Sequence, residues 1–237
     1  IFTVEEYHEA IEKLLAAGEL IKYQRGVQNG GNTYYYRKIT YYDESNAAEA
    51  VISLSERRPA ITTSPSQIRK FLESQNSTLA EEQIEAVIMA VTHGFFILTG
   101  GPGTGKTFTM TAVVKALKQF RPQIRITQAA PTAKAASRMR EVTNLDSDTI
   151  HSIFKIGIGD FTDDSDFVLD TDFLIIDEAS MIGSALFAAM LRRLSEKACV
   201  LIVGDPAQLP SVDCGDVLKA LCMSRVVPMT ELKEIHR

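Results

Sequence analysis

After about residue 76 the chain alternates short apolar runs with segments of helical periodicity. We predict four strands from the apolar runs, at residues 95–98, 124–130, 173–176 and 198–203. A polar loop follows each run, and after the first loop residues 107–118 repeat apolar side chains at helical spacing. Strands that alternate with helices form a parallel sheet, and ligands bind outside the carboxyl ends of its strands. The pattern therefore predicts an α/β fold with a ligand site at that edge.

The first 75 residues follow a different pattern. Apolar residues recur at helical spacing over 4–17, and two extended segments, 20–26 and 33–39, are joined by a loop rich in Gly and Asn. A helix followed by a hairpin outlines a small winged-helix-like module, and further helices are predicted at 43–57 and 66–74. We therefore predict three parts: the winged-helix-like module at 1–42, connecting helices within 43–75, and the α/β domain at 76–237.

The overall composition narrows the class of protein. A hydrophobic content of 45% in 237 residues is enough to build a core. The 25 basic and 30 acidic side chains give a net charge of −5, so a nucleic-acid partner needs a local basic patch. No apolar run is long enough to cross a bilayer, and the first residues do not form a signal peptide. We expect a soluble, cytoplasmic protein with no membrane partner.

The cysteines and the chain ends add two expectations. Cys199, Cys214 and Cys222 are odd in number and lack C-x-x-C spacing, which predicts reduced thiols and neither a disulfide framework nor a zinc site. The chain begins at Ile1 and stops at Arg237 without a tail, so we expect a fragment of a longer protein.

Residues 100–107, Gly-Gly-Pro-Gly-Thr-Gly-Lys-Thr, fill every fixed position of the phosphate-binding loop pattern G-x-x-x-x-G-K-[ST]. The glycines let successive backbone N–H groups point at the phosphates, Lys106 reaches the β and γ oxygens, and the Thr107 hydroxyl ligates Mg²⁺. The loop therefore predicts that the protein binds a nucleoside triphosphate together with Mg²⁺. Its predicted binding residues are Gly101, Pro102, Gly103, Thr104, Gly105, Lys106 and Thr107.

Two more strand ends carry candidate catalytic side chains. Asp177 and Glu178 follow the apolar run 173–176, as in a Walker B element, in which the first acid holds Mg²⁺ and the second polarises the attacking water. Gln208 lies in the loop after 198–203, where an amide can sense the γ-phosphate. A simple Gly-Pro turn is the alternative for this last loop.

Taken together, the segments 100–107, 177–180, 204–211 and 130–132 closely resemble the first motor domain of superfamily 1 DNA helicases. Within that superfamily the chain is similar to the RecD-like group, which includes the alpha subunit of exodeoxyribonuclease V. The resemblance runs from about Leu79 to Arg237, with the motifs in family order. It implies a RecA-like P-loop NTPase sheet, with ATP and Mg²⁺ as ligands.

The resemblance also assigns residues that the local pattern does not. Gln83 in the segment 79–87 corresponds to the glutamine that reads adenine, although Ala80 replaces the family's usual capping Ser or Thr. Thr132 and Lys134 correspond to a motif that contacts the backbone of single-stranded DNA, and His151 to a second DNA-contacting element.

The last assigned residue is Arg237, which matches the arginine that reaches the γ-phosphate across the cleft between two motor domains. A frayed terminal arginine is the alternative. Because the second motor domain is absent, we expect this fragment to bind nucleotide, to hydrolyse it poorly and not to unwind DNA.

The function that the resemblance implies is an ATP-dependent DNA helicase motor that moves 5′ to 3′ on single-stranded DNA. The expected role is DNA recombination or repair, either alone or with nuclease and helicase subunits of a recombination complex. Two alternatives stay open. One is a P-loop NTPase that switches a protein partner; the other is an interaction module in which the hairpin tyrosines stack on bases or grip a partner.

The tyrosines and an acidic segment each allow a simpler interpretation. Alternate tyrosines among Tyr34, Tyr35, Tyr36, Tyr41 and Tyr42 can instead pack the hairpin. Six aspartates crowd the segment 160–172, which predicts a solvated surface loop, with a metal site as the alternative.

Overall fold

The computed structural model describes residues 3–24, 32–75, 79–157 and 166–234. A six-stranded sheet forms the centre of these residues, and all its strand pairs are parallel. Its strands in spatial order are β5 (Ser147–Thr149), β4 (Ile126–Ala130), β6 (Phe173–Ile176), β7 (Cys199–Gly204), β3 (Phe95–Gly100) and β8 (Met229–Leu232). The predicted α/β fold with a parallel sheet is confirmed.

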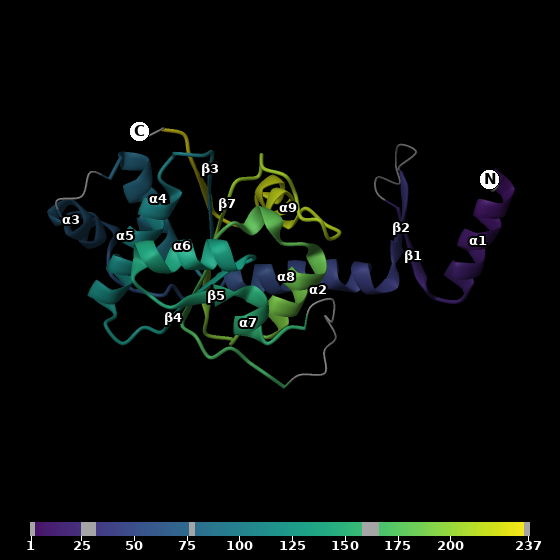
Figure 1. The fold of residues 1–237 in the computed structure, drawn as a ribbon, viewed down its shortest axis with the longest axis horizontal. Coiled ribbons are helices and arrows are strands. Elements are labelled where there is room, and N and C mark those ends of the chain that lie inside the picture. The colour runs from purple at the N-terminus through teal and green to yellow at the C-terminus, as the bar shows by residue number, and fades with distance from the viewer. Residues whose placement is uncertain (1–2, 25–31, 76–78, 158–165, 235–237) are drawn as a thin grey trace.

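Helices cover both faces of this sheet (Figure 1). One face packs against α3 (Pro65–Ser74), α4 (Glu81–Thr92), α5 (Lys106–Phe120) and α6 (Ala133–Thr143). The other packs against α2 (Lys38–Ser55), α7 (Ile150–Phe154), α8 (Ser184–Arg192) and α9 (Val217–Ser224). Because both faces are covered, β3, β6 and β7 are buried along their whole length and are continuous apolar runs.

The four predicted strands are all present, with bounds that differ by one or two residues. β5 and β8 were not predicted, because they are only three and four residues long and lie at the edges of the sheet. Half-exposed edge strands such as β8 lack the apolar run that marks a central strand.

The N-terminal segment consists of α1 (Val4–Ala16) and an antiparallel hairpin of β1 (Leu20–Gln24) and β2 (Thr33–Arg37). The predicted helix and hairpin are therefore confirmed, whereas most of the predicted connecting loop lies outside the described residues. In Figure 1 these elements stand apart from the sheet at the end of α2. The hydroxyl of Thr3 accepts the Glu6 amide, and the Glu6 carboxylate accepts the Thr3 amide, so a capping box starts α1.

Helix α2 begins five residues earlier than predicted and replaces the end of the predicted second strand. Residues 39–42 include β-branched and aromatic side chains, but Tyr41 packs against Tyr23 and Tyr36 from the helix, with ring centroids 6.5 and 5.9 Å apart. These tertiary contacts outweigh the local β propensity. α2 also runs unbroken across residue 42, while the three-part division of the chain stays a prediction.

The tyrosines divide into two groups. Tyr23, Tyr36 and Tyr41 form edge-to-face or tilted contacts with one another, so packing accounts for them. Tyr42 joins this group through a ring contact with Tyr41, with centroids 5.7 Å apart. Tyr34 and Tyr35 are exposed to the same degree as Tyr23, but they make no ring contact with other described residues. The packing interpretation therefore holds for the first group only.

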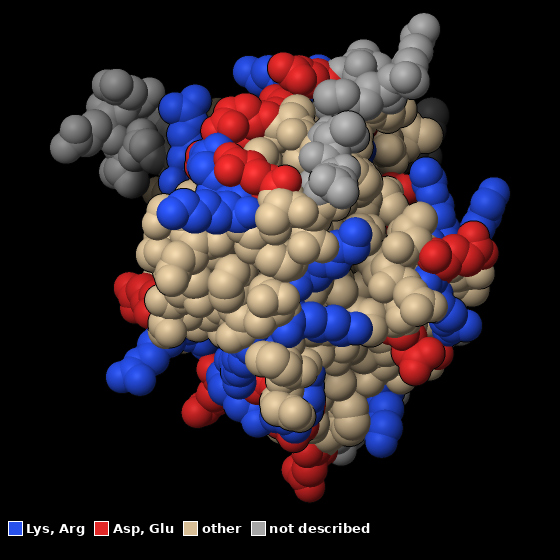
Figure 2. All heavy atoms as spheres, turned by 90° about the vertical axis from the view of Figure 1, so that its left-hand side faces the viewer, with Lys and Arg blue, Asp and Glu red and all other residues tan. Residues whose placement is uncertain are grey.

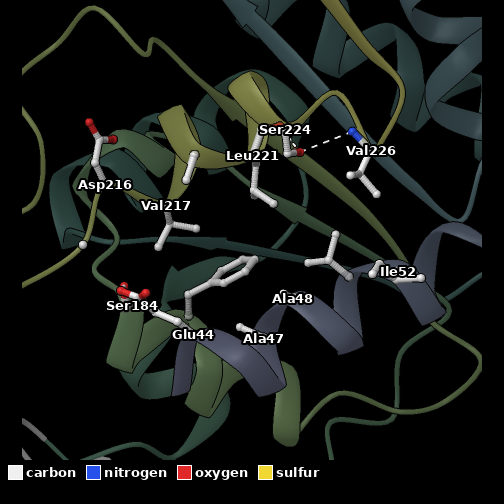
Figure 3. A pocket seen from close by; sticks show the side chains of 14 residues that line it. Glu44, Ala47, Ala48, Ile52, Ser184, Asp216, Val217, Leu221, Ser224 and Val226 are labelled. Carbon is white, nitrogen blue, oxygen red and sulfur yellow. Dashed lines mark hydrogen bonds between the residues drawn. The ribbon is translucent and has the colours of Figure 1, made fainter. Parts of the chain in front are cut away.

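The second half of α2 joins the core of the large domain. Ala47, Val51 and Leu54 are buried with α8 against the sheet, and Asp43 forms a 3.0 Å ion pair with Arg192 of α8. Beside this contact lies an apolar hollow of about 350 Å³ between α2, α8 and α9 (Figure 3). Its polar end carries Glu44, Ser184 and Asp216.

Among the described helices, none has the length and apolar character that a membrane crossing requires. The charged side chains at the end of the domain formed by α3 and α4 are also mixed in sign. Figure 2 shows Lys and Arg interspersed there with Asp and Glu.

We predict that Gly94→Ala destabilises the contact between α2 and the sheet. A Cβ at Gly94 lies 2.2 Å from the backbone oxygen of Leu54, so one of the two elements must move. The expected loss in the free energy of unfolding is about 1–3 kcal/mol, measured by urea denaturation. Gly101→Ala is the control, because a Cβ there meets nothing within 4 Å. Equal midpoints for both variants would contradict the prediction.

Candidate nucleotide site

The parallel register places the ends of three central strands side by side. β3 pairs with β7 up to Thr99 and Gly204, and β6 pairs with β7 up to Ile176 and Ile202. The loops that leave these strands enclose a pocket of about 520 Å³. Its lining residues are Gln83, Gly101, Pro102, Gly103, Thr104, Gly105, Lys106, Thr107, Phe108, Arg138, Asp177, Glu178 and Gln208.

The phosphate-binding loop has the backbone that its glycines allow. Gly103 and Gly105 have φ values of +81° and +85°, in the region that favours glycine. Helix α5 begins at Lys106, so its N-terminal amides and positive dipole end face the pocket. The Lys106 ammonium donates to the carbonyls of Gly100 (2.6 Å) and Gly101 (3.0 Å), and the Thr104 hydroxyl donates to Gly101 (2.9 Å).

Asp177 and Thr107 provide oxygen atoms for a hard cation. The Asp177 carboxylate accepts the Glu178 amide at 2.9 Å. Burial raises the pKa of Asp177 and the Glu178 charge adds to this rise, while the hydrogen bond from the Glu178 amide opposes it most, followed by the charges of Lys106 and Arg138. Mg²⁺ is usually held by one or two protein oxygens together with phosphates and water, which fits this pair.

Within the described ranges, no group of three or more His, Cys, Asp or Glu side chains is arranged to hold a metal ion by itself. In the acidic segment, Asp170 is exposed and pairs with Arg125, as expected of a surface loop. Asp172 is instead buried, and its carboxylate pairs with Arg121 and Arg125, so the surface interpretation does not hold for this residue. The members of the segment from 160 to 164 lie outside the described residues.

Glu178 is held in an unusual backbone conformation. Its φ of 54° and ψ of 39° are left-handed, which is uncommon for a residue other than glycine and costs about 1–3 kcal/mol. The carboxylate lines the pocket beside Asp177. Strain of this kind persists where surrounding structure enforces it, and here it directs a carboxylate toward the phosphate loop.

The loop after β7 carries Gln208 into the same pocket. Asp205 shapes this loop, since its carboxylate accepts the Ala207 amide (2.9 Å) and its carbonyl accepts the Gln208 amide (3.1 Å). Gly204 allows close packing, because a Cβ there lies 2.7 Å from Leu218. The loop is thus a turn, as the simpler interpretation has it, and also a wall of the pocket.

Gln83 is only 1% exposed, and its amide is already bonded. Its Oε1 accepts the Ala80 amide at 3.0 Å, and its Nε2 donates to the Thr104 carbonyl at 3.2 Å. The first bond closes the start of α4, where Ala80 has no side-chain oxygen with which to cap the helix. The second bond links α4 to the phosphate loop.

The predicted DNA-contacting residues lie at the same edge of the sheet but outside this pocket. Ala130 of β4 pairs with Thr149 of β5, so Thr132 and His151 follow neighbouring strands. The Thr132 hydroxyl accepts the Ala135 amide at 3.2 Å and caps α6. Lys134 is exposed in the first turn of α6, and His151 is half-buried in α7.

Two arginines remain, one predicted as a site residue and one not. Arg237 lies outside the described residues, although Lys233 and Glu234 just before it donate backbone amides to Glu82 of α4. Arg138 lines the pocket and was not predicted as a site residue. Its only sequence clue is its position in the segment 130–138, six residues after Thr132.

The fold and the pocket define a P-loop NTPase with a RecA-like α/β domain. The chain belongs to the AAA domain family, which matches residues 78–237. It is homologous to RecD-like helicases, which confirms the resemblance inferred from the motifs.

Three relatives illustrate this homology. The ATP-dependent RecD2 DNA helicase of Deinococcus radiodurans is 37% identical over 159 residues, which are 67% of this chain and 22% of the relative. The RecBCD enzyme subunit RecD of Haemophilus influenzae is 31% identical over 220 residues, 81% of this chain and 34% of the relative. The Pif1 helicase structure from Candida albicans has a TM-score of 0.50 and 25% identity, covering 68% of this chain and 40% of that one. The chain thus spans less than half the length of these relatives.

We predict that Asp177→Asn raises the melting temperature of the nucleotide-free protein at pH 7. The folded-state pKa of Asp177 lies above its ordinary value of 3.8, so its ionisation opposes folding at neutral pH. That penalty is lost as the pH falls through the folded-state pKa, and the difference between variant and wild type should shrink in parallel. One kcal/mol corresponds to about 2–4 °C at this length.

The control for this experiment is Asp166→Asn, which changes an exposed aspartate. It should leave the melting temperature unchanged across the same pH range. If Asp177→Asn were instead less stable than the wild type at pH 7, burial would not be the dominant influence on this carboxylate.

Proposed function

We propose that this chain is the first motor domain of an ATP-dependent DNA helicase. The observation that carries the proposal is the convergence of Lys106, Asp177, Glu178 and Gln208 on one pocket, in a chain homologous to RecD-like helicases. ATP as the nucleotide is part of this proposal. Gln83 lines the α4 side of the pocket, and it would have to exchange its bonds to Ala80 and Thr104 to contact adenine.

We propose one role in hydrolysis for each of these side chains, and their places in the pocket support it. The α5 N-terminus and Lys106 bind the phosphates, with Lys106 exchanging its carbonyl partners for phosphate oxygens. Thr107 and Asp177 would hold Mg²⁺, and the ion would supply positive charge to neutralise the phosphates. Glu178 orients the attacking water and accepts its proton. Gln208 contacts the γ-phosphate, so its loop responds to hydrolysis.

Thr132, Lys134 and His151 support a track for single-stranded DNA along the neighbouring edge of the sheet. The Thr132 hydroxyl caps α6 by accepting the Ala135 amide, and a helix N-terminus of this kind is suited to a phosphate. Translocation also requires a second motor domain, and Arg237 would reach the γ-phosphate across the cleft between the two domains. The 5′ to 3′ direction, a role in recombination or repair, and association with nuclease or helicase subunits belong to this proposal as well.

The test is ATP hydrolysis by the full-length protein, with and without single-stranded DNA. We expect the strand to raise the rate severalfold, because strand binding and hydrolysis are coupled in a motor. An NTPase that switches a protein partner would show no such rise, and this result would overturn the helicase proposal.

Substitutions at the pocket sharpen the test. Glu178→Gln should lower kcat by about 10²–10⁴ and keep nucleotide affinity, because it removes the base and retains the shape. Lys106→Ala should abolish triphosphate binding. Glu196→Gln, at an exposed glutamate, is the matched control and should change neither quantity. An unchanged kcat in Glu178→Gln would refute the role given to Glu178.

A further inference from the structure

Arg138 is the second cationic side chain of the nucleotide pocket. It lies on α6 with an exposed side chain and lines the pocket together with Lys106, Asp177 and Glu178. Within the described ranges its guanidinium makes no hydrogen bond or ion pair. Arg140, two residues further along, is instead engaged with the Ser147 carbonyl.

The topology decides which end of the pocket Arg138 approaches. α6 packs against β4, β5 and α5, so it comes from the side of the sheet next to β6 and Asp177. Gln83 comes from the opposite side, because α4 packs against β3 and β8. Arg138 therefore faces the catalytic carboxylates, and Gln83 lies across the phosphate loop from it.

The charges in the pocket favour a cation beside Asp177 and Glu178. Lys106 is the other cation among the described lining residues, and Asp177 and Glu178 contribute two carboxylates. A magnesium-bound triphosphate brings further negative charge. A planar guanidinium offers paired donors that match two phosphate oxygens, whereas a lysine offers a point charge.

We propose that Arg138 binds the terminal phosphate of the nucleoside triphosphate and stabilises the charge that develops there during hydrolysis. The inference rests on the proposed hydrolysis at this pocket. It gives the reaction an arginine from within the same domain, in addition to any arginine that a second domain supplies.

The experiment compares nucleotide affinities of full-length wild type and Arg138→Ala, with Mg²⁺ and without DNA. ADP affinity should stay within about twofold, because ADP lacks the phosphate that Arg138 contacts. Affinity for a non-hydrolysable ATP analogue should fall about tenfold, as expected for one lost charge-assisted contact. The kcat for ATP should fall about 10²–10³, with partial recovery in Arg138→Lys.

Arg140→Ala is the matched control, since it removes a guanidinium from the same helix outside the pocket. It should keep the wild-type ratio of ADP to analogue affinity. Unchanged analogue affinity and kcat in Arg138→Ala, or equal loss of ADP and analogue affinity, would overturn the assignment of Arg138. A wild-type protein that binds no nucleotide would instead refute the proposed function.

Discussion

The parallel pairing of β3, β6 and β7 is the constraint on which the nucleotide pocket depends. Side chains that are distant in sequence, such as Lys106 and Asp177, follow strands whose carboxyl ends meet at one edge. A parallel sheet must be covered on both faces, so the pocket also requires the two helical layers. The buried strands thus fix the positions of the polar side chains that follow them, although these side chains contribute little to the packing of the core.

The same burial sets the electrostatics of the site. Removal of Asp177 from water disfavours its charge, and the neighbouring Glu178 adds repulsion. The left-handed backbone at Glu178 is a further cost. A bound metal ion would relieve the electrostatic part of this cost, as Lys106 and Arg138 already do in part. The features that lower the stability of the unliganded protein therefore lie in the pocket itself, where a metal-bound triphosphate would offset the charge repulsion.

The central part of this architecture could be predicted from the sequence, because buried parallel strands and the phosphate loop leave strong local patterns. The edge strands β5 and β8 could not be predicted, because they are short, partly exposed and show no apolar periodicity. The start of α2 was missed because Tyr41 owes its helical position to contacts with distant tyrosines. Arg138 was missed for a similar reason: its place in the pocket depends on how α6 packs beside β4 and α5.

The packing of α2 connects the N-terminal segment to the catalytic edge. Its buried residues Val51 and Leu54 share a core with β3, whose carboxyl end becomes the phosphate loop. At the close of α2, Arg57 donates to the carbonyls of Ser195 and Ala198 just before β7, the strand that leads to Gln208. α2 and the residue Arg57 that follows it therefore contact the two strands at the ends opposite to the loops of the pocket. α2 thus contacts the hairpin near its first residues and the core of the large domain through its later ones, so one helix connects the N-terminal segment with the sheet of the nucleotide pocket.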